Sequence, residues 1–246
     1  MAIGIPVVNA PNLYVDGLEL SWASDETLTI QAGAARNSTD GNDIEVAASL
    51  TLSNIVAGVN GLDTGTVASS TMYAVYAIGS SYGVVASASL LSLASSAAPT
   101  LPSEYDMYRR IGWALTDGTS DFLMFYQYGA DTTRQYFYDV GISELAAGSS
   151  ATYAAVDLAT SVPPIATTVI MDIDYTPTGA TDVAEFLPFG SSATNGVVRF
   201  GCGVIAAQVG TVSIPSALDG SAPTIQYKVT AGDALTLLTM GYYDYL

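Results

Sequence analysis

The chain of 246 residues carries six cationic and 23 acidic side chains, a formal net charge of −17. This charge argues against nucleic acid and anionic membrane surfaces as partners, because phosphate binding needs clustered Lys and Arg. The sequence contains no histidine, which excludes Ser-His-Asp and Cys-His nucleophiles and histidine-containing zinc sites, and no phosphate loop or dinucleotide fingerprint occurs, so no cofactor is expected.

The predicted elements begin with an extended arm at residues 1–11, which hold two prolines and no clear hydrophobic period. A first β domain is predicted at residues 12–130. Its expected strands are 14–22, 27–32, 44–52 and 71–78. The last of these is apolar on both faces, which predicts a central strand.

Residues 99–128 hold seven aromatic side chains and are predicted to form a buried hairpin in the core of this domain. Residues 107–115 and 122–128 are its two expected strands. The Asp117-Gly118 pair is the expected turn between them.

The succession of short strands and turns starts again after residues 129–133. A second domain is therefore predicted at residues 131–246, and it meets the first near residue 131. Its eight expected strands are 134–142, 151–158, 167–175, 184–189, 196–207, 210–214, 224–229 and 234–242. Short strands at this spacing predict a two-sheet sandwich of the jelly-roll type. Residues 143–147 are a candidate helical turn. The predicted fold class is therefore all-β, with two β-sandwich or jelly-roll-like domains.

Half of the residues are hydrophobic, only 12% are charged, and the mean hydropathy is +0.37. No run of about 18 apolar residues is uninterrupted, so no membrane insertion is expected. A chain this apolar is expected to cover surface in subunit contacts. We therefore expect an obligate homo-oligomer, with a homotrimer as the first choice, or a part of a larger assembly.

Glycoside hydrolysis requires a pair of carboxylates, and the sequence contains candidates for such a pair, so this reaction must be considered. Asp172 and Asp174 lie on one face of a predicted strand, and the other candidates are Asp139, Asp157 and Glu185. The favoured interpretation is that Asp172 and Asp174 mark the solvent side of this strand. Its expected buried side carries Val169, Met171, Ile173 and Tyr175.

Two acidic loops, residues 40–43 and 117–121, offer oxygen ligands for calcium, but neither matches a full calcium loop. Turn formation by Asp is the favoured explanation, and no metal site is predicted. Cys202 stands alone between two glycines, so no internal disulfide is expected, and a small buried hydrophobe is its predicted role.

Arg109 and Arg110 form the only adjacent cationic pair of the chain. On a strand they point to opposite faces, so one is expected to pair with a carboxylate such as Asp106 or Glu104. The other is a candidate contact to a neighbouring subunit.

The C-terminal tyrosines Tyr242, Tyr243 and Tyr245 are further candidate inter-subunit contacts. Sixteen tyrosines in the chain are also compatible with a glycan-binding surface, since aromatic faces stack on sugars. Core or interface use is the favoured interpretation, because Tyr is a good strand residue with a polar end.

Four segments carry a family resemblance: YAVYAIG at 73–79, LLS at 90–92, PTLP at 99–102 and YDMYRRIGW at 105–113. Together they resemble a block found in structural proteins of tailed bacteriophages, in tail fibres and other particle-surface proteins. The resemblance covers about residues 12–128, and residues 134–246 are outside it. It implies a location on the virion surface and no defined activity.

These observations predict a non-enzymatic structural protein of a tailed-phage virion, exposed on the particle surface, in the tail fibre or adsorption apparatus. Capsid decoration, as a cement or head-fibre protein, is the alternative, and a polysaccharide-degrading enzyme is a third hypothesis. The expected partners are further copies of the chain, other virion proteins and a host-surface glycan.

Overall fold

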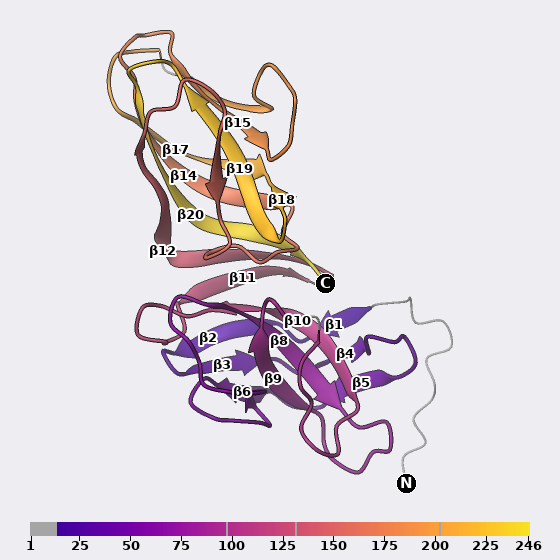
Figure 1. Cartoon of the computed structure of the whole chain (residues 1–246). Coiled ribbons are helices and arrows are strands. Elements are labelled where there is room, and N and C mark those ends of the chain that lie inside the picture. Colours follow the sequence, from indigo (N-terminus) through magenta and orange to yellow (C-terminus); the bar gives the residue numbers. More distant parts are fainter. Residues whose placement is uncertain (1–13, 97, 131, 202) are drawn as a thin grey trace.

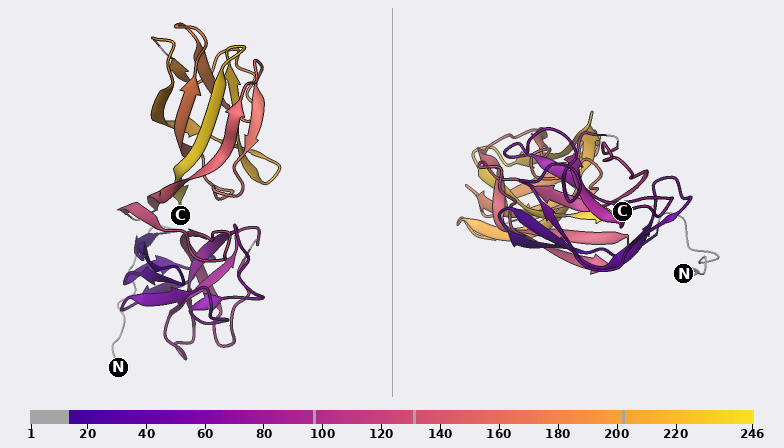
Figure 2. Two further views of the ribbon diagram at one scale, coloured as in Figure 1. Left: turned by 90° about the vertical axis from the view of Figure 1, so that its left-hand side faces the viewer. Right: turned by 90° about the horizontal axis from the view of Figure 1, so that it is seen from below.

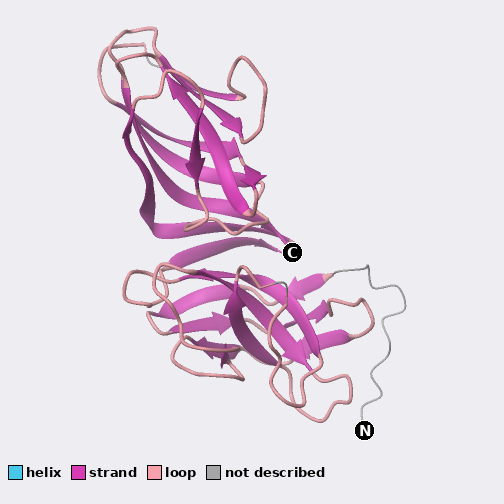
Figure 3. Cartoon of the chain, in the orientation of Figure 1, coloured by secondary structure: helices cyan, strands magenta, loops and turns pink. Residues whose placement is uncertain are grey.

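The structure is a computed structural model that describes residues 14–96, 98–130, 132–201 and 203–246. Every regular element in these ranges is a strand, which confirms the all-β prediction (Figure 3). The predicted arm at residues 1–11 and Cys202 lie outside the described residues. A search of the described residues for a helix long and apolar enough to span a membrane finds none.

Ten strands of the N-terminal half, residues 14–124, form three small sheets, and their buried side chains belong to a hydrophobic core that continues into the other half. Their bounds are β1 Val15–Gly17, β2 Leu20–Ser24, β3 Thr27–Ile30, β4 Gly33–Arg36, β5 Asp43–Val46, β6 Leu50–Ser53, β7 Gly61–Leu62, β8 Met72–Gly79, β9 Ala88–Leu93 and β10 Met107–Leu115. The sheet orders are β1-β4-β5, β2-β3-β6 and β10-β8-β9-β7. Strand β8 is buried along its whole length between β10 and β9, so the predicted central strand is confirmed.

The single strand predicted at residues 14–22 is wrong, because a turn divides it into β1 and β2, which belong to different sheets. Gly17 and Leu18 both have positive φ, 67° and 59°. Glycine adopts this left-handed conformation without steric cost, and its presence allows the chain to change direction here.

The hairpin predicted between residues 107–115 and 122–128 is also wrong. Strand β10 pairs with β8, and the pairing across the turn is limited to a bridge between Thr116 and Phe122 with backbone hydrogen bonds from Asp117 to Asp121 and from Leu123 to Leu115. The next strand, β11 (Phe125–Ala130), pairs instead with β12 (Thr133–Gly148). The predicted burial holds for residues 107–115 and for Phe122 and Phe125, whereas Tyr126 and Tyr128 are exposed, and aromatic content could not identify the partner strands.

The C-terminal half, residues 125–246, contains two five-stranded sheets. Its remaining strands are β13 Ala154–Asp157, β14 Thr168–Thr176, β15 Val183–Pro188, β16 Val198–Gly201, β17 Gln208–Pro215, β18 Ala217–Asp219, β19 Ala222–Val229 and β20 Ala234–Tyr245. One sheet has the order β11-β12-β20-β14-β17, and the other has the order β13-β19-β15-β16, with β18 paired to β19. The helical turn predicted at residues 143–147 is wrong, since these residues continue β12 through a series of register shifts against β20.

Without β11 and β18, eight strands of this half pair first with last, second with seventh, third with sixth and fourth with fifth. These pairs are β12 with β20, β13 with β19, β14 with β17 and β15 with β16. A long antiparallel hairpin rolled into two sheets has this order, which is that of a jelly roll. Tyr175 of β14 meets Phe200 of β16 edge to face at 6.5 Å between ring centroids, so inward side chains of the two sheets pack together. The predicted sandwich is compatible with this pairing, whereas the N-terminal half divides its strands among three sheets.

The two halves lie end to end, and the C-terminus of the chain lies where they meet (Figures 1 and 2). Strand β11 precedes the boundary predicted near residue 131, yet it is hydrogen-bonded to β12, which follows that boundary. The sheet is therefore continuous across this point, and its ends at β11, β12 and β20 face the N-terminal half.

Candidate functional site

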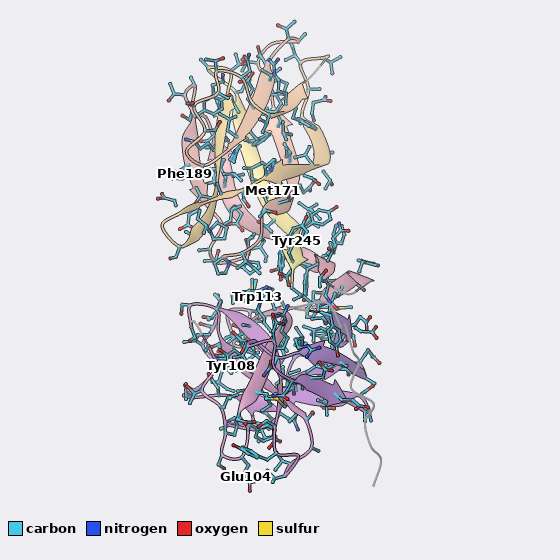
Figure 4. All side chains as sticks on the ribbon, turned by 90° about the vertical axis from the view of Figure 1, so that its right-hand side faces the viewer. Glu104, Tyr108, Trp113, Met171, Phe189 and Tyr245 are labelled. Carbon is cyan, nitrogen blue, oxygen red and sulfur yellow. The ribbon has the colours of Figure 1, made fainter. Side chains whose placement is uncertain are left out.

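A polar junction between the halves brings together several of the residues that the sequence singled out. The antiparallel register of β12 and β20 places Arg134 opposite Asp244 and Tyr136 opposite Tyr242. Side chains two residues apart on a strand share a face, so all four point to the same side of the sheet. All four are buried, and Arg134, Tyr136 and Asp244 form hydrogen bonds with residues of the N-terminal half. Figure 4 labels Trp113 and Tyr245 on the two sides of this junction.

Arg134 reaches from β12 into the N-terminal half and is fully buried there. Its guanidinium donates to the main-chain carbonyl oxygens of Leu18 at 2.9 Å, Ile111 at 2.8 Å and Gly17 at 2.6 Å. Burial lowers the pKa of Arg134, but an arginine stays charged even so. One charged group thus binds two separate segments of the N-terminal half.

These carbonyl oxygens are available because both segments depart from regular pairing. In the β10–β8 ladder the register shifts between Arg110 and Gly112, so Ile111 is the extra residue of a β-bulge. A bulge leaves backbone groups outside the ladder. The carbonyls of Gly17 and Leu18 lie in the left-handed turn between β1 and β2. The irregular backbone therefore creates the acceptors that Arg134 binds.

A second arginine crosses the junction in the opposite direction. Arg110 of β10 binds both carboxylate oxygens of Asp244, at 3.1 and 2.8 Å, and donates to the Tyr245 carbonyl at 2.9 Å. Its guanidinium carbon also lies 4.8 Å from the centre of the Trp113 ring. Both carboxylate contacts come from one guanidinium nitrogen, Nη1, and the carbonyl contact comes from Nη2; such charge-assisted hydrogen bonds are stronger than neutral ones. The two arginines therefore link the halves in both directions.

An aromatic stack completes the junction. The rings of Tyr136 and Tyr242 lie 4.9 Å apart at 18°, and the Tyr136 hydroxyl accepts hydrogen bonds from Gln127 at 2.5 Å and from the Trp113 amide at 3.3 Å. Burial raises the pKa of both phenols, so they stay protonated. A Cβ at Gly112 would lie 2.3 Å from the Tyr136 hydroxyl oxygen, and glycine is required there for this approach.

The five predicted contact residues thus occupy different environments. Arg110 binds Asp244 of its own chain, so one of the two arginines does pair with a carboxylate, although with neither of the two named as examples; Asp106 accepts bonds from Ser81. The remaining predicted residues are Arg109 and Tyr242, which are buried, Tyr243, which is half-buried, and Tyr245, which is 52% exposed. An inter-subunit role for the five residues stays a prediction.

The sequence reasoning missed Arg134 and Asp244 as members of this site. A signal was present, because Arg134, Tyr136 and Tyr138 alternate along β12 and all three are buried. A charged residue at an inward position of an apolar strand indicates a specific buried partner.

The carboxylates considered for hydrolysis lie on four different strands, and only Asp172 and Asp174 share one, β14. Asp172 is half-buried and Asp174 exposed, while Val169, Met171, Ile173 and Tyr175 are buried, so the solvent-side interpretation of these aspartates is confirmed. Asp139 accepts a bond from Tyr126, and Asp157 accepts one from the Ala159 amide. Glu185 lies on the other sheet of this half and binds two cationic side chains.

Turn formation by an aspartate is confirmed in the loop at residues 117–121, whereas the turn acceptor of the loop at residues 40–43 is Asn37, which precedes it. The Asp117 Oδ1 atom accepts the amide hydrogens of Thr119 and Asp121, and in the other loop the Asn37 Oδ1 atom accepts those of Gly41 and Asn42. Within the described ranges no group of three acidic or cysteine side chains is placed to hold a metal ion.

No protein-family model matches this sequence, and no curated protein is significantly similar to it. A proposal about function must therefore be based on the geometry of the junction. Arg134 and Asp244 are fully buried, Arg110 is half-buried, and their hydrogen bonds to one another or to backbone form an arrangement suited to coupling two parts mechanically.

Proposed function

We propose that the chain is a non-enzymatic structural protein of a tailed-phage virion, exposed on the particle surface, in the tail fibre or adsorption apparatus. The observation that carries the proposal is the buried junction, in which Arg134 and Arg110 join two β halves lying end to end. An extended surface part must transmit force along its length without bending at an internal joint. A joint made of enclosed charged hydrogen bonds resists opening, because the buried groups would lose their partners.

The segments that resemble phage structural proteins support the proposal through their place in the fold. Residues 73–79, 90–92 and 105–113 lie mainly in β8, β9 and β10, which form the largest sheet of the N-terminal half. The last of these segments also supplies Arg110 and Trp113 to the junction. The block therefore contributes both core and joint, as expected of a structural module.

The C-terminal half supports the same class of function. Jelly rolls recur in viral capsid and lectin domains. That association also favours the second candidate, a capsid decoration protein, because the same rigid body would clamp neighbouring capsid subunits. In either place we expect homotrimers in contact with other virion proteins.

Labelled-antibody imaging of intact particles tests the proposal. Antibodies raised against the purified chain should label the tail fibres, and the same antibodies absorbed with excess purified chain are the control. Labelling confined to the head would support the decoration alternative. Intact particles without label on any surface would overturn the virion proposal.

Two solution measurements accompany the imaging. Sedimentation equilibrium should give three times the 25.4 kDa of one chain, and a lone monomer at all concentrations would overturn the expected homotrimer. Incubation with host capsular polysaccharide should release no reducing ends. Release that requires an intact carboxylate of the chain would favour the enzyme hypothesis.

A further inference from the structure

A row of four polar side chains crosses the second sheet of the C-terminal half. The registers of β16, β15 and β19 place Arg199 directly opposite Glu185, and Glu185 directly opposite Lys228. Tyr153 immediately precedes β13, the strand on the far side of β19. The neighbours of Glu185 on β15, Ala184 and Phe186, are in the core, so alternation along the strand places the row on the outer face.

Glu185 is the centre of this row. Its carboxylate binds Arg199 at 3.0 Å and Lys228 at 2.6 Å, and it accepts the Tyr153 hydroxyl at 2.9 Å. Burial alone would raise the pKa of Glu185, but the bonds from Lys228 and Tyr153 and the charge of Arg199 hold it below its usual value. The carboxylate is therefore ionised, and it fixes two cationic groups side by side.

The two cations are unusual within this chain. Of its six cationic side chains the most exposed are Arg199, at 54%, and Lys228, at 27%. The other four are Arg36, Arg109, Arg110 and Arg134, all of them buried or half-buried. One carboxylate with two cations leaves this spot with a local charge of +1, in a chain whose net charge is −17. The most accessible positive charge is thus concentrated at one place.

The groups beside the row favour a ligand that carries hydroxyls as well as an anion. Gln226 precedes Lys228 by two residues on β19 and so shares its face. In the part of the chain that the structure describes, its Oε1 atom is buried and has no hydrogen-bond donor. Because this atom is enclosed, a ligand hydroxyl lying over β19 would supply the missing donor once the Gln226 side chain turns outward. Tyr153 adds an aromatic ring, with Lys228 Nζ 4.8 Å from its centre.

We propose that the outer face of the β13-β19-β15-β16 sheet binds an anionic saccharide, whose carboxylate or phosphate lies between Arg199 and Lys228. Arginine and lysine bind such oxyanions through charge-assisted hydrogen bonds. Glu185 is a positioning residue that holds both cations in place. The inference rests on the proposed function, because a protein on the particle surface meets the acidic glycans of its host.

Calorimetric titration of the purified chain tests the site with defined probes. Trigalacturonic acid supplies a carboxylated saccharide, glucose 6-phosphate supplies a phosphorylated one, and the methyl ester of trigalacturonic acid is the neutral control. We expect an acid to bind with a dissociation constant on the order of 1 mM and the ester to show no binding. Binding of neither acid, or equal binding of the ester, would overturn the proposal.

Variants identify the residues responsible. Arg199→Gln should weaken binding of the acid about tenfold, since it removes a charge-assisted contact, and Lys228→Gln should weaken it by a similar factor. Arg36→Gln is the matched control, because Arg36 of β4 likewise lies opposite a carboxylate on the neighbouring strand. Its Nε atom is 3.1 Å from Oδ1 of Asp43 on β5. The control variant should bind as the unmodified chain does. Unchanged binding in both site variants, or an equal loss in the control, would contradict the assignment.

Failure of this inference can be told apart from failure of the proposed function. Absence of saccharide binding would leave the particle-labelling result unchanged. Particles without label would overturn the virion proposal even if the acid bound at Arg199 and Lys228.

Discussion

Replacing Arg134 by methionine tests whether the junction couples the two halves. Methionine has a similar length and no donors, so the carbonyl oxygens of Gly17, Leu18 and Ile111 would lose the guanidinium that binds them. An unsatisfied buried acceptor costs about 1–3 kcal/mol. The apolar side chain also removes the cost of burying a charge, which offsets part of this loss. For three unsatisfied acceptors, less this offset, we expect the free energy of unfolding to fall by about 3–5 kcal/mol.

Urea unfolding followed by two probes measures this effect. Both tryptophans of the chain, Trp22 and Trp113, lie in the N-terminal half, and Trp113 also borders the junction, so their fluorescence reports that half and its contact with the other. Far-ultraviolet circular dichroism reports the strands of both halves. The two transitions should coincide in the unmodified chain and separate in the Arg134→Met variant, because the halves no longer stabilise each other.

The control is Arg36→Met, which removes an arginine paired with Asp43 at the rim of the N-terminal half. Pairs of this kind contribute about 1 kcal/mol or less, so the control should unfold nearly as the unmodified chain does. A loss of less than about 1 kcal/mol in Arg134→Met, with coincident transitions, would refute the reasoning.

Three further substitutions follow from the same structure. Asp244→Asn should lower the free energy of unfolding by about 3–5 kcal/mol, because Arg110 loses the carboxylate it binds at 2.8 Å. Urea unfolding measures this change, and a loss below about 1 kcal/mol would show that the pair does not stabilise the chain. Burial raises the pKa of Glu144 above 4.5, so the folded chain keeps a proton that the unfolded chain releases. The stabilisation from this group is thus complete below pH 4.5 and is lost as the pH rises through the folded pKa; Glu144→Gln should flatten this part of the stability profile, and an unchanged slope would contradict it. Gly112→Ala should cost about 1–3 kcal/mol through its contact with Tyr136, whereas Gly118→Ala, with open space around it, should be close to neutral in the same unfolding assay.

The pattern of apolar and polar residues along a strand predicted burial correctly where a residue's exposure depends only on its own strand. Alternation predicted that Asp172 and Asp174 lie on the solvent side of their strand. An apolar pattern on both faces predicted that residues 71–78 form a central strand. Both inferences require only the two-residue period of a strand. The turn chemistry of Asp117 was predictable for the same reason, since its partners are two and four residues away.

The junction could not be predicted, because it depends on partners far apart in the sequence. Arg110 and Asp244 are separated by 134 residues, and their meeting follows from the rolled hairpin that pairs β12 with β20. The carbonyl of Ile111 becomes an acceptor only because β10 bulges against β8. Strand β11 likewise has the aromatic pattern of a core strand, but its partner is set by the fold of the second half.

The measurement that tests the central claim most directly is differential scanning calorimetry of the unmodified chain. If the enclosed arginines make the two β halves one cooperative unit, a single heat-absorption peak will appear, and its calorimetric and van't Hoff enthalpies will agree. Two resolved peaks, or a calorimetric enthalpy about twice the van't Hoff value, would show that the halves unfold independently and would contradict the account.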